Sequence, residues 1–162
     1  MRKIQAVPVT HENFAPYGQF YTMDAPKGHA LCGEIHKFFP DRMTADSAHR
    51  VGYSPIVVER PEKMVITQQE YHTTTGEMIL PLDDAMILHC APASAGTPVP
   101  ELAEAFIVPK HTLVKLNAAI WHLAPLPATK ERLTAMIILP ECTYANDCTV
   151  ADLPEPFEIE LP

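Results

Sequence analysis

The chain has 162 residues, 47% of them hydrophobic and 20% charged, which is enough for one globular domain and unlike the composition of a disordered chain. Its 20 acidic residues outnumber its 12 basic ones, and the net charge is −8. Because a nucleic-acid interface needs basic side chains to neutralise phosphates, this composition argues against nucleic-acid binding.

The apolar segments and the cysteines indicate a cellular location. No uninterrupted apolar stretch approaches the roughly 20 residues that a membrane-spanning helix needs, and the N-terminus does not read as a signal peptide. The four cysteines form no C-x-x-C pair, so neither a disulfide framework nor a reactive-thiol site is expected. We therefore expect a cytoplasmic protein that does not bind membranes.

Seventeen prolines divide the chain into short segments and leave little room for long helices. Short apolar segments between turn residues indicate a β-sandwich or barrel. We predict an all-β fold, a cupin-like double-stranded β-barrel of jelly-roll type, as a single domain over residues 1–162. One or two short helices are expected, at residues 10–15 and 98–104. In chain order, the predicted strands cover residues 18–23, 56–60, 64–72, 77–82, 85–91, 105–108, 112–116 and 133–139.

The segment from residue 64 to residue 82 is the most informative part of the sequence. Alternate side chains of a strand share a face, so Met64, Ile66, Gln68, Glu70 and His72 are expected to point the same way, into the barrel. Residues 73–76 are typical of a turn, and Glu77 then begins the returning strand. Such a hairpin would direct Glu70, His72 and Glu77 at one point.

A later histidine could complete this group. His122 follows Ile120 and Trp121, about fifty positions after His72. Imidazole nitrogens and carboxylate oxygens together suit Ni, Zn, Mn or Fe, with positions left open for a substrate. We therefore predict a divalent metal on Glu70, His72, Glu77 and His122; the alternative is a buried hydrogen-bonded network with no metal.

Three other residues are possible substrate contacts. Arg60 ends a predicted strand, where it is either a capping charge or an anion clamp. Lys115 alternates with Leu113 and Asn117 and could point inward as a second cation. Trp121 is either a core aromatic or a platform on which substrate stacks. The tail, residues 142–162, is acidic and contains prolines, and we expect it to lie on the outside of the barrel or to join a partner subunit.

The order of several short blocks resembles that of the ureidoglycolate lyases, formerly called ureidoglycolate hydrolases, over most of the chain. Arg60 also matches an arginine that ends a strand in such proteins. Two positions depart from the family pattern: Glu77 stands where Gln is usual, and Leu123 where a second His is usual. The blocks that carry the resemblance are residues 7–10 with 14–18, 70–72 with 81–82, 102–106, 121–122 with 125–126, and 146–148 with 153–155.

The resemblance implies a cupin-like barrel that releases urea and glyoxylate from ureidoglycolate in allantoin and purine nitrogen catabolism. That makes the protein a carbon–nitrogen lyase of the amidine-lyase type, acting on a small substrate that carries a carboxylate. A metal on the four residues would activate the substrate hydroxyl, and Arg60 or Lys115 would hold the carboxylate. Without a metal, His122 would be the general base, and Glu77 and Glu70 would complete the catalytic group.

Two other interpretations remain open at this point. The Glu77 and Leu123 departures favour a metal-dependent cupin isomerase or lyase that acts on another small hydroxy or keto acid. A non-catalytic, small-molecule-binding cupin is the other possibility. In each case we expect a homodimer, because open β-sheet edges need protection and pairing across a two-fold axis supplies it.

Overall fold

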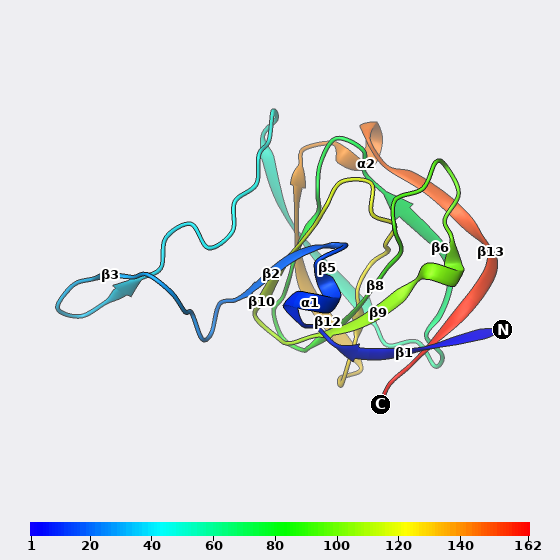
Figure 1. Ribbon diagram of the computed structural model, residues 1–162, viewed down its shortest axis with the longest axis horizontal. Coiled ribbons are helices and arrows are strands. Elements are labelled where there is room, and N and C mark those ends of the chain that lie inside the picture. The colour runs from blue at the N-terminus through cyan, green and yellow to red at the C-terminus, as the bar shows by residue number, and fades with distance from the viewer.

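Thirteen strands and two short α-helices make up the protein, described here by a computed structural model of residues 1–162 (Figure 1). The all-β, cupin-like fold is therefore confirmed. None of the helices is long and apolar enough to span a membrane. The strands are β1 (Arg2–Pro8), β2 (Gly18–Thr22), β3 (Leu31–Cys32), β4 (Lys37–Phe38), β5 (Val51–Glu59), β6 (Val65–Tyr71), β7 (Met78–Pro81), β8 (Met86–Cys90), β9 (Glu104–Val108), β10 (Thr112–Leu116), β11 (Leu126–Pro127), β12 (Arg132–Pro140) and β13 (Thr149–Glu160).

The helices are short. The first, α1 (His11–Phe14), is preceded by Thr10, whose hydroxyl accepts a hydrogen bond from the backbone of Asn13 in a capping box. The predicted helix at residues 98–104 is a 3₁₀ turn, Pro100–Leu102. A further helix, α2 (Thr143–Asn146), lies within the tail and was not predicted.

Two larger sheets carry the fold. One has the order β11-β8-β9-β1-β13-β6, the other the order β2-β10-β7-β12-β5, and β3 pairs only with β4. The two larger sheets do not close into one hydrogen-bonded barrel. At β6, only isolated bridges continue the pairing: Glu70 pairs with His122, and Trp121 pairs with Ala91 at the end of β8. Two residues are too few to form a ladder, but they bring His122 beside the end of β6.

Two apolar cores fill the interior. The first lies between the two sheets and contains Phe14, Leu88, Phe106 and Leu133. The second lies against the other face of β8 and β9, and Phe157 of β13 belongs to it. The six-stranded sheet therefore buries side chains on both faces of β8, which explains why that strand is buried at every residue.

The tail is part of a sheet. Strand β13 pairs in parallel with β1 and antiparallel with β6, so the expectation of a segment lying on the outside of a barrel is wrong for residues 149–160. The chain ends consequently lie near each other (Figure 1). Prolines and acidic residues do not exclude a strand here because the exposed positions of β13 tolerate them.

The inward-facing residues of β6 differ from the prediction. Met64 and Ile66 belong to the second core, and Gln69 is fully buried, whereas Gln68 is exposed and donates to Asp152 Oδ1 at 2.7 Å. The pairing of β6 with β13 is irregular over the same stretch, where Gln68 pairs with Asp152 but Ile66 with Phe157. The face of the strand therefore changes before Glu70, so Glu70 and His72 do not share the face of Met64 and Ile66.

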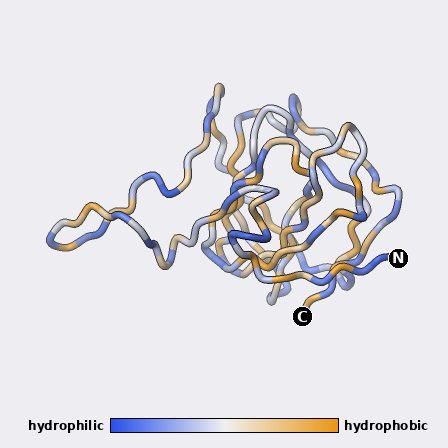
Figure 2. The backbone as a smooth tube through the Cα atoms, in the orientation of Figure 1, coloured by the Kyte–Doolittle hydropathy of each residue, from blue (hydrophilic) through white to orange (hydrophobic).

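Residues 23–50, which connect β2 to β5, leave the body of the protein, and we refer to them as the arm (Figure 1). The β3–β4 hairpin lies within the arm, and no residue of the arm is buried. Apolar segments nevertheless occur along it, as they do in the body (Figure 2). The arm starts and ends at opposite edges of the five-stranded sheet, at β2 and β5.

Candidate metal and active site

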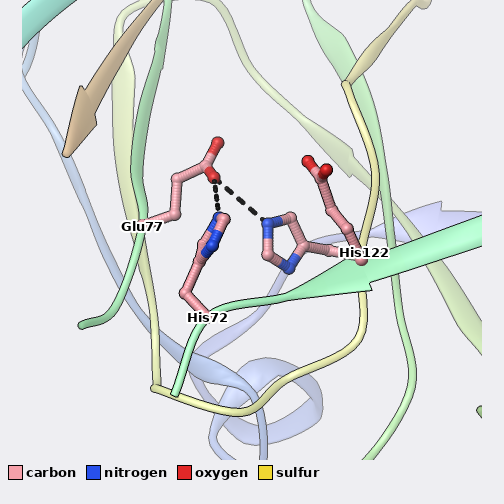
Figure 3. Close-up of side chains that lie close together, drawn as sticks. His72, Glu77 and His122 are labelled. Atoms are coloured by element: carbon pink, nitrogen blue, oxygen red, sulfur yellow. Dashed lines mark hydrogen bonds and ion pairs between the residues drawn. The ribbon is translucent and has the colours of Figure 1, made fainter. Parts of the chain in front are cut away.

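Four side chains from three segments converge between the two sheets (Figure 3). Glu70 and His72 come from the end of β6, Glu77 from the residue before β7, and His122 from the segment that bridges to β6. One possible ligand atom from each lies within 4.8 Å of those of the other three. The structure thus brings together all four residues that the sequence singled out.

Backbone carbonyls fix the orientation of both histidine rings. His72 Nδ1 donates to the carbonyl of Asp147 at 2.7 Å, and His122 Nδ1 donates to the carbonyl of Ile120 at 2.8 Å. Since Nδ1 carries the proton in each neutral ring, the Nε2 lone pairs are free. Both Nε2 atoms lie 3.1 Å from Glu77 Oε2 (Figure 3).

This arrangement needs a positive charge. Two Nε2 lone pairs and a carboxylate oxygen repel one another unless a proton or a cation lies among them. His72, Glu77 and His122 are only 2%, 4% and 2% exposed, so water cannot screen them. Two imidazole nitrogens and carboxylate oxygens are the donor set of first-row divalent metals, and hydrogen bonds from the second ring nitrogen to carbonyls are the usual outer shell of such ligands. The residues present therefore fit a divalent metal.

The same contacts govern the pKa values in the site. In the metal-free protein a proton on Nε2 of His122 or His72 lets the ring donate a hydrogen bond to Glu77. Burial alone would raise the pKa of Glu77, but these hydrogen bonds outweigh it and lower this pKa to about 2. Burial alone would lower the pKa of His72, but the contacts with Glu77 and with the Asp147 carbonyl raise it. Glu77 is consequently ionised at neutral pH and supplies the charge that attracts a cation.

Glu70 is the most accessible of the four residues. Its backbone exchanges two hydrogen bonds with His122, at 2.7 and 2.9 Å, which fixes the two residues side by side. Its Oε2 accepts a hydrogen bond from Cys148 Sγ at 3.3 Å. Burial and this hydrogen bond raise the pKa of Cys148 to about 12, so the thiol stays protonated. Glu70 is half-buried and has no stronger side-chain partner, which leaves its carboxylate available to a substrate.

Sequence reasoning missed Asp147, although it lies in one of the blocks that carried the family resemblance. Its carboxylate accepts hydrogen bonds from the backbone amides and hydroxyls of both Thr73 and Thr74, at 2.5 to 2.8 Å. Its carbonyl accepts the bond from His72. Asp147 therefore holds the turn after β6 and orients His72, and only the folded chain reveals this, because 75 positions separate Asp147 from His72.

A cleft of about 950 Å³ adjoins this site without containing the four side chains. The turn after β6, the helix α2 and the C-terminal end of the arm line it. Tyr144 of α2 is exposed, and its ring meets the ring of His72 edge-on at 6.0 Å. Burial, together with Glu77 and Glu70, raises the pKa of Tyr144, so its hydroxyl stays protonated.

The structure does not bring Arg60 to the four-residue site. Its guanidinium donates to the carbonyl of Ala128 at 3.0 Å, and it follows Glu59, which pairs with Arg132. Met78, next to Glu77, pairs with Ile138, six residues farther along β12. At about 3.3 Å per residue, Glu59 and Met78 are roughly 20 Å apart along the strands, and Arg60 and Glu77 lie one residue beyond them at opposite ends.

Lys115 and Trp121 also have other partners. Lys115 lies between the buried Val114 and Leu116 and points to the outer face of its sheet, where its ammonium donates to the carbonyl of Thr44 at 2.6 Å. Trp121 is fully buried in the second core. Its indole donates to Ser94 Oγ at 2.8 Å, and no part of the ring is open to a substrate.

A second pair of buried polar residues lies near the site. Gln69 and His89 share a hydrogen bond of 3.1 Å, and Gln69 Oε1 and His89 Nε2 have no partner. Complete burial, with a smaller contribution from His122, lowers the pKa of His89 to about 3. His89 is therefore neutral at physiological pH and adds no charge beside His122.

A family model described as Ureidoglycolate lyase matches residues 1–160, which is nearly the whole chain. A search of curated proteins finds no match.

Proposed function

The chain belongs to the ureidoglycolate lyase family, and on this basis we propose that it is a metal-dependent lyase of the amidine-lyase type that releases urea and glyoxylate from ureidoglycolate. The observation that supports a metal most strongly is the position of Glu77 Oε2, 3.1 Å from the free Nε2 atoms of two buried histidines. The family places this reaction in allantoin and purine degradation. The finer assignments that follow, of the metal, the residue roles and the assembly, are part of the proposal.

His72, Glu77 and His122 would hold the metal most tightly, with Glu70 as a weaker fourth ligand. The three are buried and fixed by neighbouring groups, whereas Glu70 is half-buried. A bound divalent ion would supply Lewis-acid chemistry, polarising the hydroxyl and carboxylate oxygens of the substrate. Ni, Zn, Mn and Fe all accept this donor set.

Glu70 is the residue that we propose moves the proton. Cleavage requires that the hydroxyl proton leave, that the oxygen lone pair form the new carbonyl, and that the carbon–nitrogen bond break with its electron pair on nitrogen. Glu70 would take the hydroxyl proton and return it to the departing urea nitrogen, so that the enzyme ends unchanged. If no metal is bound, His122 would take this role, because its Nε2 is unprotonated while Nδ1 donates to Ile120.

The positions of Arg60 and Lys115 do not support the prediction that either residue holds the substrate carboxylate. The side chain of each donates to a backbone carbonyl away from the site. We propose the polar cleft beside His72 as the route of the substrate to the site. Threonine side chains and Asn146 line it together with Asp46, Glu141 and Asp147, so its wall is polar and hydrated.

The remaining parts of the proposal concern location and assembly. All four cysteines are free, which is consistent with a cytoplasmic, reducing environment. A homodimer is proposed as well, because open sheet edges need protection and pairing across a two-fold axis supplies it.

A direct assay tests the activity. Purified protein, loaded with each metal in turn, is incubated with ureidoglycolate while glyoxylate is measured. His122→Ala, which removes a metal ligand, should nearly abolish turnover, and Glu70→Gln should lower it by about 10²- to 10⁴-fold, the range that loss of acid–base help produces. His11→Ala, an exposed histidine outside the site, is the control and should keep wild-type rates. Absence of glyoxylate from folded, metal-loaded protein would contradict the proposal.

A further inference from the structure

The short helix α2 lies where the cleft meets the four-residue site. Thr143 and Asn146 of this helix line the cleft. Between them in sequence, Tyr144 directs its ring edge-on to the ring of His72, with 6.0 Å between the ring centres. Glu70, the most accessible of the four residues, is half-buried. A molecule that moves from the cleft into the site therefore comes close to Tyr144.

Contacts on both sides of α2 fix its position. At its start, the hydroxyl of Thr143 donates to the carbonyl of Pro140 at 2.7 Å. After its end, the carboxylate of Asp147 accepts hydrogen bonds from the turn that follows β6, and the carbonyl of Asp147 accepts the bond from His72. A helix of a single turn is not stable alone in water, so these contacts hold Tyr144 beside the site.

Tyr144 faces both solvent and the carboxylates of the site. It is 59% exposed, although its ring packs against His72. Burial, together with the charges of Glu77 and Glu70, raises the pKa of its hydroxyl. Because both carboxylates act on the hydroxyl, it lies on the side of α2 that is turned toward the four residues.

The hydroxyl of Tyr144 is a free hydrogen-bond donor. It has no hydrogen-bond partner within the chain, whereas other donors near the site are already used. Cys148 donates to Glu70, and the hydroxyls of the two threonines after β6 donate to Asp147. A phenol carries its proton at neutral pH, so Tyr144 can donate to an oxygen of a bound molecule.

The proposed substrate has an acceptor that needs such a donor. The proposed reaction directs its hydroxyl and carboxylate oxygens to the four residues, which leaves the ureido group on the side of the cleft. The carbonyl oxygen of the ureido group accepts hydrogen bonds. It also gains negative charge as the carbon–nitrogen bond breaks, because the electron pair left on nitrogen is shared with this oxygen.

We propose that the hydroxyl of Tyr144 donates a hydrogen bond to the ureido carbonyl oxygen of the substrate and so selects acids that carry a ureido group over other 2-hydroxy acids. The inference rests on the proposed lyase function. It assigns recognition of the leaving group to α2, whereas the four residues of the site act on the hydroxyl and the carboxylate.

The reaction balances without a proton from Tyr144. Glu70 takes the hydroxyl proton and returns it to the departing nitrogen, so urea leaves neutral and Tyr144 keeps its own proton. Between these two transfers, the hydrogen bond stabilises the charge that the nitrogen and the carbonyl oxygen share. The bond is therefore stronger in the transition state than in the bound substrate, and its loss should lower kcat more than it weakens binding.

The binding of two small acids to metal-loaded protein tests the proposal without turnover. N-carbamoylglycine has the ureido group and the carboxylate but no hydroxyl, so it cannot be cleaved in this way. Glycolate has the hydroxyl and the carboxylate but no ureido group. Tyr144→Phe keeps the ring against His72 and removes the hydroxyl. In titration calorimetry it should weaken the binding of N-carbamoylglycine about fivefold, the effect of one neutral hydrogen bond, and leave the binding of glycolate unchanged.

Tyr53→Phe is the matched control, because Tyr53 is 68% exposed on β5, outside the site. This variant should bind both acids as the wild type does. On ureidoglycolate, the kcat of Tyr144→Phe should fall by more than about fivefold, whereas the kcat of Tyr53→Phe should not change.

The inference is overturned, with the lyase reaction intact, if the wild type releases glyoxylate and Tyr144→Phe binds N-carbamoylglycine as tightly as the wild type. It is also overturned if the variant loses the same affinity for both acids, which would place the hydroxyl at the carboxylate. A wild type that releases no glyoxylate contradicts the lyase reaction, and a selective loss of N-carbamoylglycine binding would then still support the hydrogen bond. Binding of neither acid to the wild type would overturn both.

Discussion

At the scale of single residues, the chemistry of the site depends on Glu77. Its carboxylate is ionised, buried and 3.1 Å from each free imidazole nitrogen. A carboxylate that cannot be screened by water favours a cation far more than an amide of the same shape does. Glutamate at this position therefore favours divalent-metal binding.

Glu77→Gln should lower the affinity for a divalent metal by more than the roughly 10- to 100-fold that loss of an outer-shell partner costs. The amide keeps the size of the side chain but removes the charge that attracts the cation. Titration calorimetry with Zn²⁺ and Ni²⁺ measures the effect. Glu104→Gln, which removes a carboxylate outside the four-residue site, serves as the control, and equal affinities in both variants would contradict this role of Glu77.

Asp147 acts through His72, so it is a positioning residue. Asp147→Asn should weaken metal binding roughly 10- to 100-fold while leaving the fold intact. The amide cannot accept all four hydrogen bonds of Thr73 and Thr74, so the turn that carries the His72 contact loosens. Metal affinity is measured, and the effects on KM and on kcat are determined separately. A purely structural role would lower thermal stability and leave the metal affinity of the folded protein unchanged.

At the scale of elements, side chains that cap turns hold the segments that carry the site. Asp84, between β7 and β8, is 4% exposed and accepts hydrogen bonds from the amides of Ala85, Thr129 and Lys130 at 2.8 to 2.9 Å. Burial would raise its pKa, but these hydrogen bonds, with one from the Thr129 hydroxyl, lower it. Asp84 therefore connects the β7–β8 turn to the segment before β12.

Asp84→Asn should destabilise the protein by about 3 kcal/mol at pH 7, since hydrogen bonds to a charged acceptor contribute about 1.5–3 kcal/mol each and do not add fully. Folding lowers the pKa of Asp84. The stability that its carboxylate contributes is therefore fully present above the unfolded pKa near 4, and it is lost as the pH falls through the folded pKa. The difference in the free energy of unfolding between variant and wild type should thus shrink in acid. Urea unfolding at pH 7 and pH 3 checks this, with the exposed Asp46→Asn as control; a gap that grows in acid would contradict it.

The elements also show what the sequence could and could not predict. Strand β10 was predicted with its observed ends, because Thr112–Leu116 alternates cleanly between turn residues. The short β3, β4 and β11 were missed, and so was β1. The long β13 was missed because its acidic residues and prolines conceal its buried Leu153, Phe157 and Ile159. The change of face within β6 coincides with an irregular pairing to β13, between residues 84 to 91 positions apart, and no local pattern contains it.

The candidate site was more predictable than the strand that carries it. Glu70, His72 and Glu77 are close in sequence, but the predicted hairpin is wrong, because β6 and β7 lie in different sheets and do not pair with each other. The three side chains still meet, since only residues 72–77 connect the two strands. The pattern of these three residues followed by a distant histidine predicted His122, and the family resemblance included the same block. Arg60 and Lys115 were singled out by charge, but the direction of a long side chain depends on the neighbours it finds, here the carbonyls of Ala128 and Thr44. Asp147 could not be assigned a role, because its partners lie across the fold.

At the scale of the whole molecule, metal binding should be coupled to folding. The four ligands come from three segments of the fold and meet only in the folded state, so a metal that binds there stabilises the protein. At a free metal concentration 100 times Kd, the gain is about 2.7 kcal/mol. For a domain of this size that corresponds to a rise in Tm of about 5–10 °C. Differential scanning calorimetry with and without metal measures it, and a rise of the same size in His122→Ala would show that the metal binds elsewhere.

The most direct test of the account is the metal content of the purified protein. Wild-type protein and the His72→Ala/His122→Ala double variant are dialysed against equal concentrations of Ni²⁺, Zn²⁺, Mn²⁺ or Fe²⁺ and then analysed by plasma mass spectrometry. We predict about one metal ion per wild-type chain for at least one of these metals, and less than about a tenth of that for the double variant. A folded wild-type chain that retains none of the four metals, or a double variant that retains as much as the wild type, would contradict the claim that these histidines and Glu77 form a metal site.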